Sequence, residues 1–359
     1  MSEIKGEVIK MSEMMKAVAK LKEGYGNIGM MEIEKPKLRN EDDVLFRVTS
    51  VGVCGTDISI YKWTDTVARE YHPKFPLVIG HEMSGIVEEV GANVTRFKPG
   101  DHITVNEHIF CGKCSQCLKG RTCICEDREI LGCHINGAMT EYVVVRQMNC
   151  FKLPDNIPHN SGCIAEPMSV AIHAVERLPV SKDDVVVVFG VGTIGLSVCI
   201  VLLEAGAKVL AVGTQVDGKR LDIARELGAI PVMLGSQDLL DEIHKTGKKW
   251  ADKAYECSGA EMALKQAIEV IEPAGCVCEV GIPGKEIPIN VGGQIVFREK
   301  TIIGSRAFYH ATWDKTMKLL AKSGDKAEKL ITHRLPLEKF EDAVKLIQSG
   351  ECVKTVICP

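Results

Sequence analysis

The sequence lacks the features that are typical of nucleic-acid-binding and membrane proteins. It has no block of lysine and arginine, its aromatic residues do not alternate with basic ones, and its net charge is −4, so we expect no nucleic-acid partner. The first twenty residues contain no apolar run, which predicts neither a signal peptide nor a membrane-spanning segment. The first fourteen residues are polar and are expected to form a frayed or strand-like extension.

Internal repeats and low-complexity segments are also absent, and the composition is that of an ordinary globular enzyme. The 359 residues are 45% hydrophobic and 26% charged, and a chain of this length usually forms two domains. Fifteen cysteines without an export signal indicate a reducing cytoplasm, where clustered cysteines bind metals more often than they form disulfides. We therefore expect a cytoplasmic protein.

Four of the cysteines follow the spacing C-x2-C-x2-C-x7-C, at Cys111, Cys114, Cys117 and Cys125. Thiolates at this spacing can surround one Zn²⁺ tetrahedrally. Such a site leaves no position for a substrate, so it organises a loop and performs no chemistry. Cys123 lies inside the run and is an alternative fourth ligand. The competing interpretation is a set of free or disulfide-bonded cysteines.

The pattern of apolar residues changes along the chain. In the first 150 residues, short apolar runs separated by Gly, Pro and Asp predict strands at residues 44–53, 86–90, 103–105 and 142–145. After Pro167, strands and helices alternate, with strands at Val185–Phe189 and 208–212 around a helix at 194–205. This alternation predicts a doubly wound parallel sheet. From about Thr312, two helices and the strand Lys354–Cys358 are expected to return to the first domain.

A glycine-rich turn follows the strand that ends at Phe189. Its sequence is GxGxxG, formed by Gly190, Val191, Gly192, Thr193, Ile194 and Gly195. Because it opens a helix, it has the context of a dinucleotide site, in which the glycines allow a tight turn, close approach of a pyrophosphate and helix packing. The pyrophosphate would lie at the helix N-terminus. The alternative is a glycine-rich turn without a ligand.

The residue that selects between NAD and NADP is left open. NAD-binding chains carry an acid about 20 residues after the glycine turn, but here the second strand ends at Gly213, Thr214 and Gln215. Asp217 is either a ribose ligand or the N-cap of the next helix. Alternatively, Gly213 and Thr214, with Lys219 and Arg220 beyond them, accept a 2′-phosphate.

Two further motifs carry residues that bind zinc well. Cys54 begins C-G-T-D after the strand at 44–53, and His81 and Glu82 belong to G-H-E. A thiolate, an imidazole and a carboxylate leave one coordination position for water or an alcohol oxygen, which is typical of a catalytic zinc. Each motif alone is a weak signal, and their weight comes from co-occurring with the cysteine quartet and the glycine turn.

In this order, with an A-E-P segment at residues 165–167, the motifs resemble those of the zinc-containing medium-chain alcohol dehydrogenases from Met15 to Pro359. Residues 54–63 and 331–334 are similar to threonine dehydrogenases, and residues 165–170 resemble the sorbitol-type pattern. The resemblance implies a GroES-like β-rich catalytic domain at 1–165, with a structural-zinc lobe at 107–128. It also implies a Rossmann NAD(P)-binding domain at 166–311 and a return to the catalytic domain at 312–359.

The resemblance also assigns roles to residues. It implies two zinc ions per chain, a structural one on the quartet and a catalytic one on Cys54, His81 and Glu82. Glu166 is the implied fourth ligand, or its partner through water, and the nearby Cys163 is better explained as a core residue. Thr56 takes the place of the first proton-relay hydroxyl, and Asp57 is expected to orient a ligand.

One departure from the family concerns the proton relay. Many relatives have a histidine five residues after the zinc cysteine, where this chain has Ser59, and serine is no base near pH 7. Water or another group would complete the relay, with His72 and His108 as weak candidates. Arg306 is expected to contact the cofactor phosphate or a charged substrate, or to form an ion pair.

The implied function is hydride transfer between NAD(P) and a secondary alcohol, such as a polyol, diol, amino alcohol or 3-hydroxy amino acid. Zinc would lower the pKa of the bound alcohol. A zinc-independent quinone or enone reductase of the same superfamily is the first alternative, and a zinc-finger-like binding protein is the second. The expected partner is a small alcohol or ketone. We expect a homodimer or homotetramer, with residues 287–297 pairing edge strands between subunits.

Overall fold

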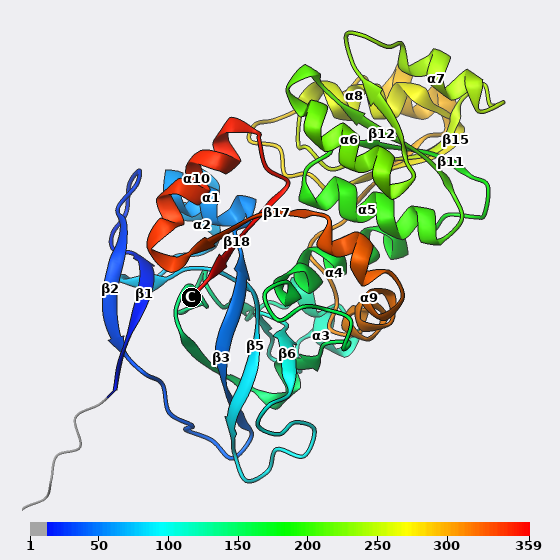
Figure 1. Ribbon diagram of the computed structural model, residues 1–359. Coiled ribbons are helices and arrows are strands. Elements are labelled where there is room, and N and C mark those ends of the chain that lie inside the picture. The colour runs from blue at the N-terminus through cyan, green and yellow to red at the C-terminus, as the bar shows by residue number, and fades with distance from the viewer. Residues whose placement is uncertain (1–12) are drawn as a thin grey trace, which may run out of the picture.

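Two sheets of different kinds organise the chain (Figure 1). The computed structural model describes residues 13–359, so the expectations for the first twelve residues lie outside it. One part holds the blue, cyan and red segments of Figure 1 and is built on a mostly antiparallel sheet, in which one pair of strands at the chain end is parallel. The other, green to yellow, is built on a parallel sheet. Together they confirm the expected α/β class with a GroES-like and a Rossmann unit.

The antiparallel part contains a seven-stranded sheet in the order β10-β6-β5-β3-β18-β17, with β9 also paired to β3. Its strands are β3 (Asp43–Gly52), β5 (Glu82–Val90), β6 (His102–Val105), β9 (Tyr142–Arg146), β10 (Cys150–Lys152), β17 (Ile331–Pro336) and β18 (Lys354–Cys358). Because β18 pairs with β3, the end of the chain lies in the sheet that the first 150 residues build. Nearly all of β3 is buried, with Val44, Phe46 and Val48 in the core and only Arg47 exposed.

Smaller elements surround this sheet. They are the strands β1 (Met14–Lys20), β2 (Ile28–Glu34), β4 (Leu77–Val78), β7 (His108–Ile109) and β8 (Glu129–Ile130), and the helices α1 (Gly55–Lys62), α2 (Asp65–Glu70), α3 (Ser115–Leu118) and α10 (Phe340–Ser349). The hairpin of β7 and β8 encloses the lobe that carries the cysteine quartet.

The second part has six parallel strands in the order β13-β12-β11-β14-β15-β16. The strands are β11 (Val185–Phe189), β12 (Lys208–Gly213), β13 (Ile230–Met233), β14 (Ala251–Glu256), β15 (Ile271–Glu279) and β16 (Thr301–Gly304). All five residues of β11 are buried, as expected of a parallel strand covered on both faces. The strand order reverses between β11 and β14, and ligands of such sheets bind at this point, beyond the carboxyl ends of the strands.

Helices cover this sheet and join the two parts. They are α4 (Ala165–Arg177), α5 (Thr193–Glu204), α6 (Gly218–Leu227), α7 (Leu239–Lys245), α8 (Glu261–Val270) and α9 (Thr312–Glu328). Helix α9 packs against α4, where the Ser169 and Thr316 hydroxyls lie 2.9 Å apart. Within residues 13–359, no helix is both long and apolar enough to cross a bilayer.

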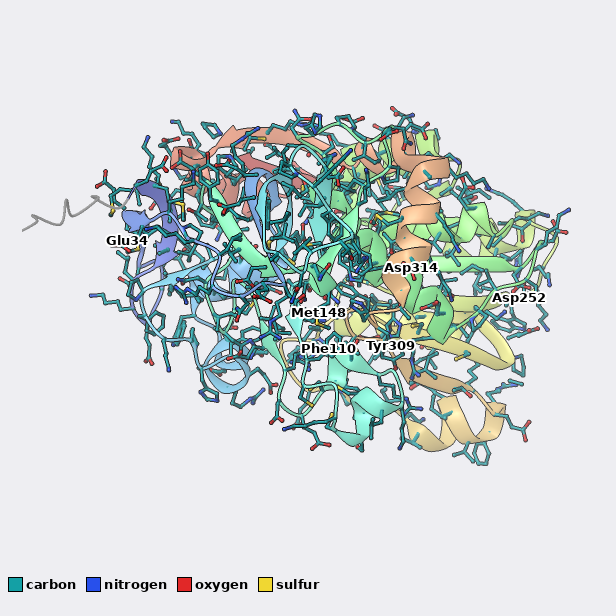
Figure 2. All side chains as sticks on the ribbon, turned by 90° about the horizontal axis from the view of Figure 1, so that it is seen from below. Glu34, Phe110, Met148, Asp252, Tyr309 and Asp314 are labelled. Atoms are coloured by element: carbon teal, nitrogen blue, oxygen red, sulfur yellow. The ribbon has the colours of Figure 1, made fainter. Side chains whose placement is uncertain are left out.

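The segment after β16 lies beside the cysteine lobe. The Phe308 ring is 5.2 Å from the His108 ring, and the Phe110 ring is 5.5 Å from that of His310. The labels of Phe110 and Tyr309 mark this junction in Figure 2. Residues that follow the parallel sheet thus reach the start of the lobe, next to the strands that carry the candidate metal ligands.

Residues 287–297, expected to pair edge strands between subunits, do not form a strand in this chain. Residues Val291–Ile295 and Val296–Arg298 form helical turns instead. Two adjacent glycines allow the turn, and the Asn290 side chain accepts a hydrogen bond from the backbone N–H of Gly293 at 3.0 Å. The edge strands of the parallel sheet are β13 and β16.

Candidate active site

The pairing of β3 with β5 brings together the two motifs that carry the candidate zinc ligands. Glu82 lies opposite Gly52 in this pair, and Cys54 follows two residues later as the N-cap of α1. The ligand atoms of Cys54, His81 and Glu82 lie within 4.8 Å of one another. A Cβ at Gly52 would come within 1.9 Å of the Glu82 carboxylate, so glycine at this position leaves room for the ligand.

Asp57 lies behind His81. One carboxylate oxygen of Asp57 accepts a hydrogen bond from the backbone N–H of Cys54 at 2.8 Å, and the other is 3.7 Å from Nδ1 of His81. Neither of these last two atoms has a hydrogen-bond partner within residues 13–359. Burial would lower the pKa of His81, but Asp57 and Cys54 raise it well above its usual value. The site therefore favours a positive charge, as either a proton or a metal ion provides.

Lys354 of β18 completes this cluster, although no sequence motif pointed to it. Its Nζ lies 2.7 Å from both carboxylate oxygens of Glu82 and 3.2 Å from the carbonyl of Val53. Burial opposes its charge, but Glu82 raises its pKa, so Lys354 is a cation at neutral pH. The signal in the sequence was a lysine that begins the otherwise apolar strand K-T-V-I-C. Glu82 thus faces both a lysine and the candidate metal position.

Glu166 lies in the first turn of α4 and is buried, outside the group of three mutually close ligand atoms. Burial, and then the charge of Glu82, raise its pKa to about 7. Thr56 lies beside the cluster, with its Oγ1 3.8 Å from the sulfur of Cys54. Cys163 is fully buried in the hydrophobic core, in agreement with a core residue.

Ser59, which stands at the position of the relay histidine, forms a hydrogen bond within its own helix. The Ser59 hydroxyl donates to the carbonyl of Gly55 at 3.1 Å, a contact within α1. His72 is exposed at a positive φ of 41°, whereas His108 is buried. Burial and the nearby Arg128 and Arg306 lower the pKa of His108 to about 3, so it is neutral near pH 7.

Glu107 was not assigned from the sequence. It lies directly before β7 and is 2% exposed. Its Oε1 is 3.5 Å from Nε2 of His108, and its Oε2 is buried without a partner in the described part of the chain. Burial, and then the charge of Glu166, raise its pKa well above the usual value. The segment N-E-H-I-F resembles an ordinary strand end, so only the fold reveals its proximity to the candidate ligands.

The four quartet sulfurs also converge. The sulfurs of Cys111, Cys114, Cys117 and Cys125 lie within 4.8 Å of one another, and Cys123 is not part of the group. Backbone N–H groups of Cys111 and Cys114 donate to the sulfurs of Cys125 and Cys111, both at 3.3 Å. Such donors stabilise thiolates, and four sulfurs fill a tetrahedral shell. The donor set suits a structural zinc.

The glycine turn has the geometry of a dinucleotide site. Gly190 has a φ of +89°, and a Cβ at Gly195 would come within 1.8 Å of the Gly190 carbonyl. Gly192 differs from both. Its φ is −75°, and a Cβ there would meet no atom within 4 Å. Neither backbone conformation nor packing requires a glycine at this position, so the open space at the N-terminus of α5 is available to a ligand.

Beyond β12, Asp217 and Arg220 are engaged with the protein. One oxygen of Asp217 accepts from the backbone N–H and hydroxyl of Thr214, each at 2.9 Å, and the other from Arg220 at 3.0 Å. Arg220 also donates to the carbonyl of Cys352 at 2.8 and 3.0 Å. Asp217 is the first residue before α6, but its side chain bonds backwards to Thr214 rather than capping that helix.

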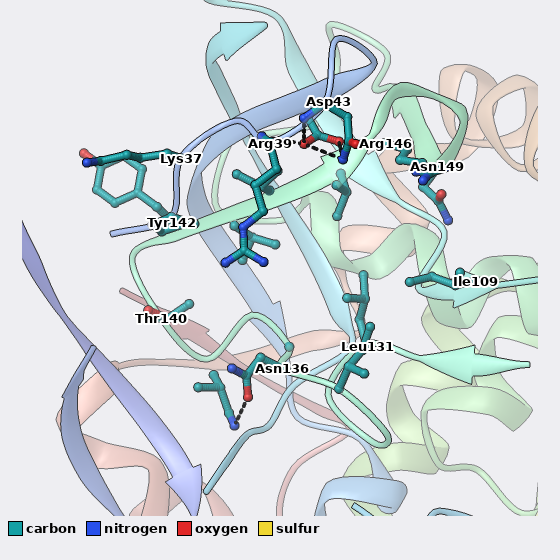
Figure 3. Close-up of a pocket in the computed structure, with 18 of the residues that line it drawn as sticks. Lys37, Arg39, Asp43, Ile109, Leu131, Asn136, Thr140, Tyr142, Arg146 and Asn149 are labelled. Atoms are coloured by element: carbon teal, nitrogen blue, oxygen red, sulfur yellow. Dashed lines mark hydrogen bonds between the residues drawn. The ribbon is translucent and has the colours of Figure 1, made fainter. Parts of the chain in front are cut away.

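A separate cavity of about 910 Å³ lies on the flank of the antiparallel part. Figure 3 shows Arg39, Tyr142 and Asn136 around it, with Asn136 bonded to the backbone of Val78. None of the candidate ligands of the catalytic metal lines this cavity. We assign it no role in the chemistry.

Comparison with known proteins decides the family. Residues 40–155 match the alcohol dehydrogenase GroES-like domain, and residues 193–322 match the zinc-binding dehydrogenase domain. The chain is 34% identical to the sorbitol dehydrogenase of Halalkalibacterium halodurans, over 96% of this chain and 99% of the relative. It is 33% identical to the L-threonine 3-dehydrogenase of Bacillus licheniformis, again over 96% and 99%.

A solved structure agrees. A zinc-binding dehydrogenase from Sinorhizobium meliloti 1021, bound to NADP, superposes with a TM-score of 0.86 and 28% identity, over 97% of this chain and 100% of that one.

The chain belongs to the zinc-containing medium-chain alcohol dehydrogenases.

Family membership establishes the activity class. The protein is a zinc-dependent enzyme that transfers a hydride between a secondary alcohol and NAD(P). The chemistry of its donor atoms fits the metal, since one group offers sulfur, nitrogen and oxygen and the other four sulfurs. The alternatives of a zinc-independent reductase and of a finger-like binding protein are not supported.

The open space at Gly192 predicts a selective effect on the cofactor. Gly192→Ala should weaken NAD(P)H binding by about 10-fold or more, because the methyl group occupies the space through which a pyrophosphate approaches the backbone. Thermal stability should not change. Fluorescence titration and a melting curve measure the two effects. Gly195→Ala, the matched control, should instead destabilise the fold by about 1–3 kcal/mol through overpacking. Unaltered cofactor affinity in Gly192→Ala would show that the turn has no ligand.

The buried pair of Lys354 and Glu82 predicts a metal-dependent stability change. Lys354→Met should destabilise the zinc-free protein by about 3–5 kcal/mol, because it leaves a buried carboxylate without a cation. Added zinc should recover part of the loss. Urea unfolding with and without zinc measures both. Lys345→Met breaks an exposed pair with Asp342 and should cost no more than about 1 kcal/mol. Equal effects of the two variants would argue against the pair.

The geometry of the quartet predicts different outcomes for two neighbouring cysteines. Cys117→Ser should lose one zinc per chain and lower the melting temperature, because one of four ligands is removed. Cys123→Ser lies in the same lobe but outside the group, and it should keep both zinc ions. Metal analysis and calorimetry on the two variants measure this. If Cys123→Ser lost a zinc ion and Cys117→Ser did not, Cys123 would have to be a ligand of the structural zinc.

Proposed function

We propose that Cys54, His81 and Glu82 hold the catalytic zinc, with Glu166 as a fourth ligand or as its partner through water. The mutual approach of the three ligand atoms to within 4.8 Å carries this proposal. We assign the structural zinc to Cys111, Cys114, Cys117 and Cys125. A zinc ion at the first site supplies Lewis acidity that lowers the pKa of an alcohol.

The surrounding side chains position the ligands and handle the proton. Asp57 orients His81 from behind, and Lys354 holds Glu82 in place. The Thr56 hydroxyl, next to Cys54, accepts the proton of the alcohol and passes it toward solvent. Ser59 is bonded within its own helix and the exposed His72 is distant in the sequence from the relay position, so we propose that water completes the relay.

The cofactor lies, in this proposal, along residues Gly190 to Gly195, with its pyrophosphate at the N-terminus of α5. Val191, Thr193 and Ile194 shape the turn, and Gly213 and Thr214 face the adenosine ribose. Asp217 and Arg220 affect cofactor binding indirectly, through their contacts with the protein. One carboxylate oxygen of Asp217 accepts from Thr214 and the other from Arg220. Asp217 therefore positions Thr214 and leaves no free acid to reject a 2′-phosphate. This arrangement favours tolerance of NADP beside NAD.

The division of the chain and its assembly are further parts of the proposal. We divide it into a catalytic domain at 1–165, a cofactor domain at 166–311 and a return at 312–359, which the pairing of β18 with β3 supports. Exposed Val296 and Phe297, next to edge strand β16, support a homodimer or homotetramer. All fifteen cysteines are free thiols, which supports a reducing, cytoplasmic location.

Replacement of the zinc cysteine tests the catalytic assignment. Cys54→Ser should lower turnover of secondary alcohols at least about 100-fold, because Lewis-acid stabilisation is worth several kcal/mol. The fold and the structural zinc should persist. Measurements are initial rates with NAD and with NADP over a panel of alcohols and ketones, zinc content and circular dichroism. Cys163→Ser, the buried neighbour, should keep turnover. Full activity in Cys54→Ser would favour the zinc-independent reductase.

A further inference from the structure

Glu107 is the feature of the site that the proposed mechanism does not use. Its carboxyl group is buried, one oxygen faces neutral His108 and the other has no partner among residues 13–359. A buried carboxyl oxygen without a hydrogen bond costs folding free energy, and a charged one costs more. Such groups are retained where a ligand completes them, so the question is which ligand fits.

The balance of charge around Glu107 identifies the kind of ligand. Four carboxyl groups are buried here, those of Asp57, Glu82, Glu107 and Glu166, against one buried cation, Lys354. Zinc with a Cys54 thiolate adds one net positive charge. Glu82 is matched by Lys354, and the metal is shared by the ligands around it, so at least one carboxylate lacks a cation. A positively charged ligand would supply the missing charge.

The position of Glu107 is that of a group that meets substrate rather than metal. It is not among the mutually close metal-binding atoms, yet Glu166, His81 and Glu82 all act on its charge. It lies directly before His108, on which Phe308 packs from the segment that follows the cofactor sheet. It therefore lies where the two parts of the molecule meet, beside the candidate metal position.

Cations close to Glu107 would disfavour the binding of an ammonium group there, so the nearby arginines must be considered. Arg306 and Arg128 both act on His108. Arg306 is exposed, without an ion pair in the described residues, and Arg128 donates to the carbonyl of Cys123. These cations suit a carboxylate or hydroxyl elsewhere on the same substrate, whereas the buried carboxyl of Glu107 suits a positive group.

We propose that Glu107 binds the ammonium group of a substrate that carries an amine next to its secondary alcohol. This inference rests on the proposed alcohol dehydrogenase function and narrows its substrate class to amino alcohols and 3-hydroxy amino acids. The ammonium group supplies a positive charge beside Glu107 and donates to its unpartnered oxygen. A diol of the same skeleton offers a hydroxyl but no charge, so it gains less from the same contact.

Two substrates with one carbon skeleton test the proposal. The zinc-loaded enzyme is assayed with 3-amino-2-butanol and with 2,3-butanediol, and wild type should prefer the amino alcohol. Glu107→Gln should reduce kcat/KM for the amino alcohol by about 10- to 100-fold and for the diol by about 3-fold at most, because it removes the charge but keeps a polar group of similar size. Glu107→Asp keeps the charge and should retain the preference.

Controls separate binding from folding. Glu129→Gln changes an exposed carboxylate on the adjacent strand β8 and should alter neither substrate. Zinc content and the melting temperature should be equal in all variants. Calorimetric titration with sec-butylamine, which has no hydroxyl group to oxidise, should show weaker binding to Glu107→Gln than to wild type.

The outcomes distinguish the two proposals. If wild type oxidises the diol but not the amino alcohol, the alcohol dehydrogenase function stands and the role of Glu107 is wrong. Equal losses for both substrates in Glu107→Gln would also overturn it, since Glu107 would then support the metal site in general. If the zinc-loaded enzyme oxidises no secondary alcohol, the proposed function itself fails.

Discussion

The buried contact between Lys354 and Glu82 is the constraint on which the site depends. It joins the last strand of the chain to the first residue of β5, directly after His81, and it places a fixed cation beside a carboxylate that would otherwise be uncompensated in the core. A buried ion pair of this kind is weak support for stability in itself, but breaking it is costly. The charge that neutralises Glu82 therefore lies 272 residues later in the chain, so the first 150 residues alone leave this carboxylate without its cation.

The same contact means that Lys354 and the proposed metal compete for the Glu82 carboxylate. Glu82 lies within reach of Cys54 and His81, yet both of its oxygens are 2.7 Å from Lys354. A carboxylate shared in this way is a weaker metal ligand than a free one. Glu166, whose carboxyl is buried nearby and is not paired with a lysine, is then well placed to take up the remaining coordination. In the proposed site, Cys54 and His81 would be the stronger ligands, and Glu82 and Glu166 would differ in how freely their carboxyl groups can bind the metal.

Much of the fold and of the candidate site could be predicted from the sequence, because the decisive signals are local. The glycine turn after Val185–Phe189 and the cysteine spacing specify backbone geometry within a few residues, and β11 and β18 have the predicted bounds. Glu107 and Lys354 could not be found in this way. Their roles depend on which distant strands pair, and β3 with β18 is a contact that no short window of sequence reveals. The helical turns at 291–298 were missed for a related reason: apolar residues suggested a strand, whereas Asn290 and two glycines determined the backbone.

Three consecutive residues near the chain end contact both functional regions. The carbonyl of Cys352 accepts from Arg220 of α6, the carbonyl of Val353 accepts from the Thr193 hydroxyl at the start of α5, and the side chain of Lys354 holds Glu82. The first two contacts anchor the edge where the nucleotide is proposed to lie, and the third anchors the carboxylate that is proposed to bind the metal. One tripeptide thus contacts both the edge proposed for the nucleotide and the carboxylate proposed for the metal, so a change in its backbone would displace both regions together.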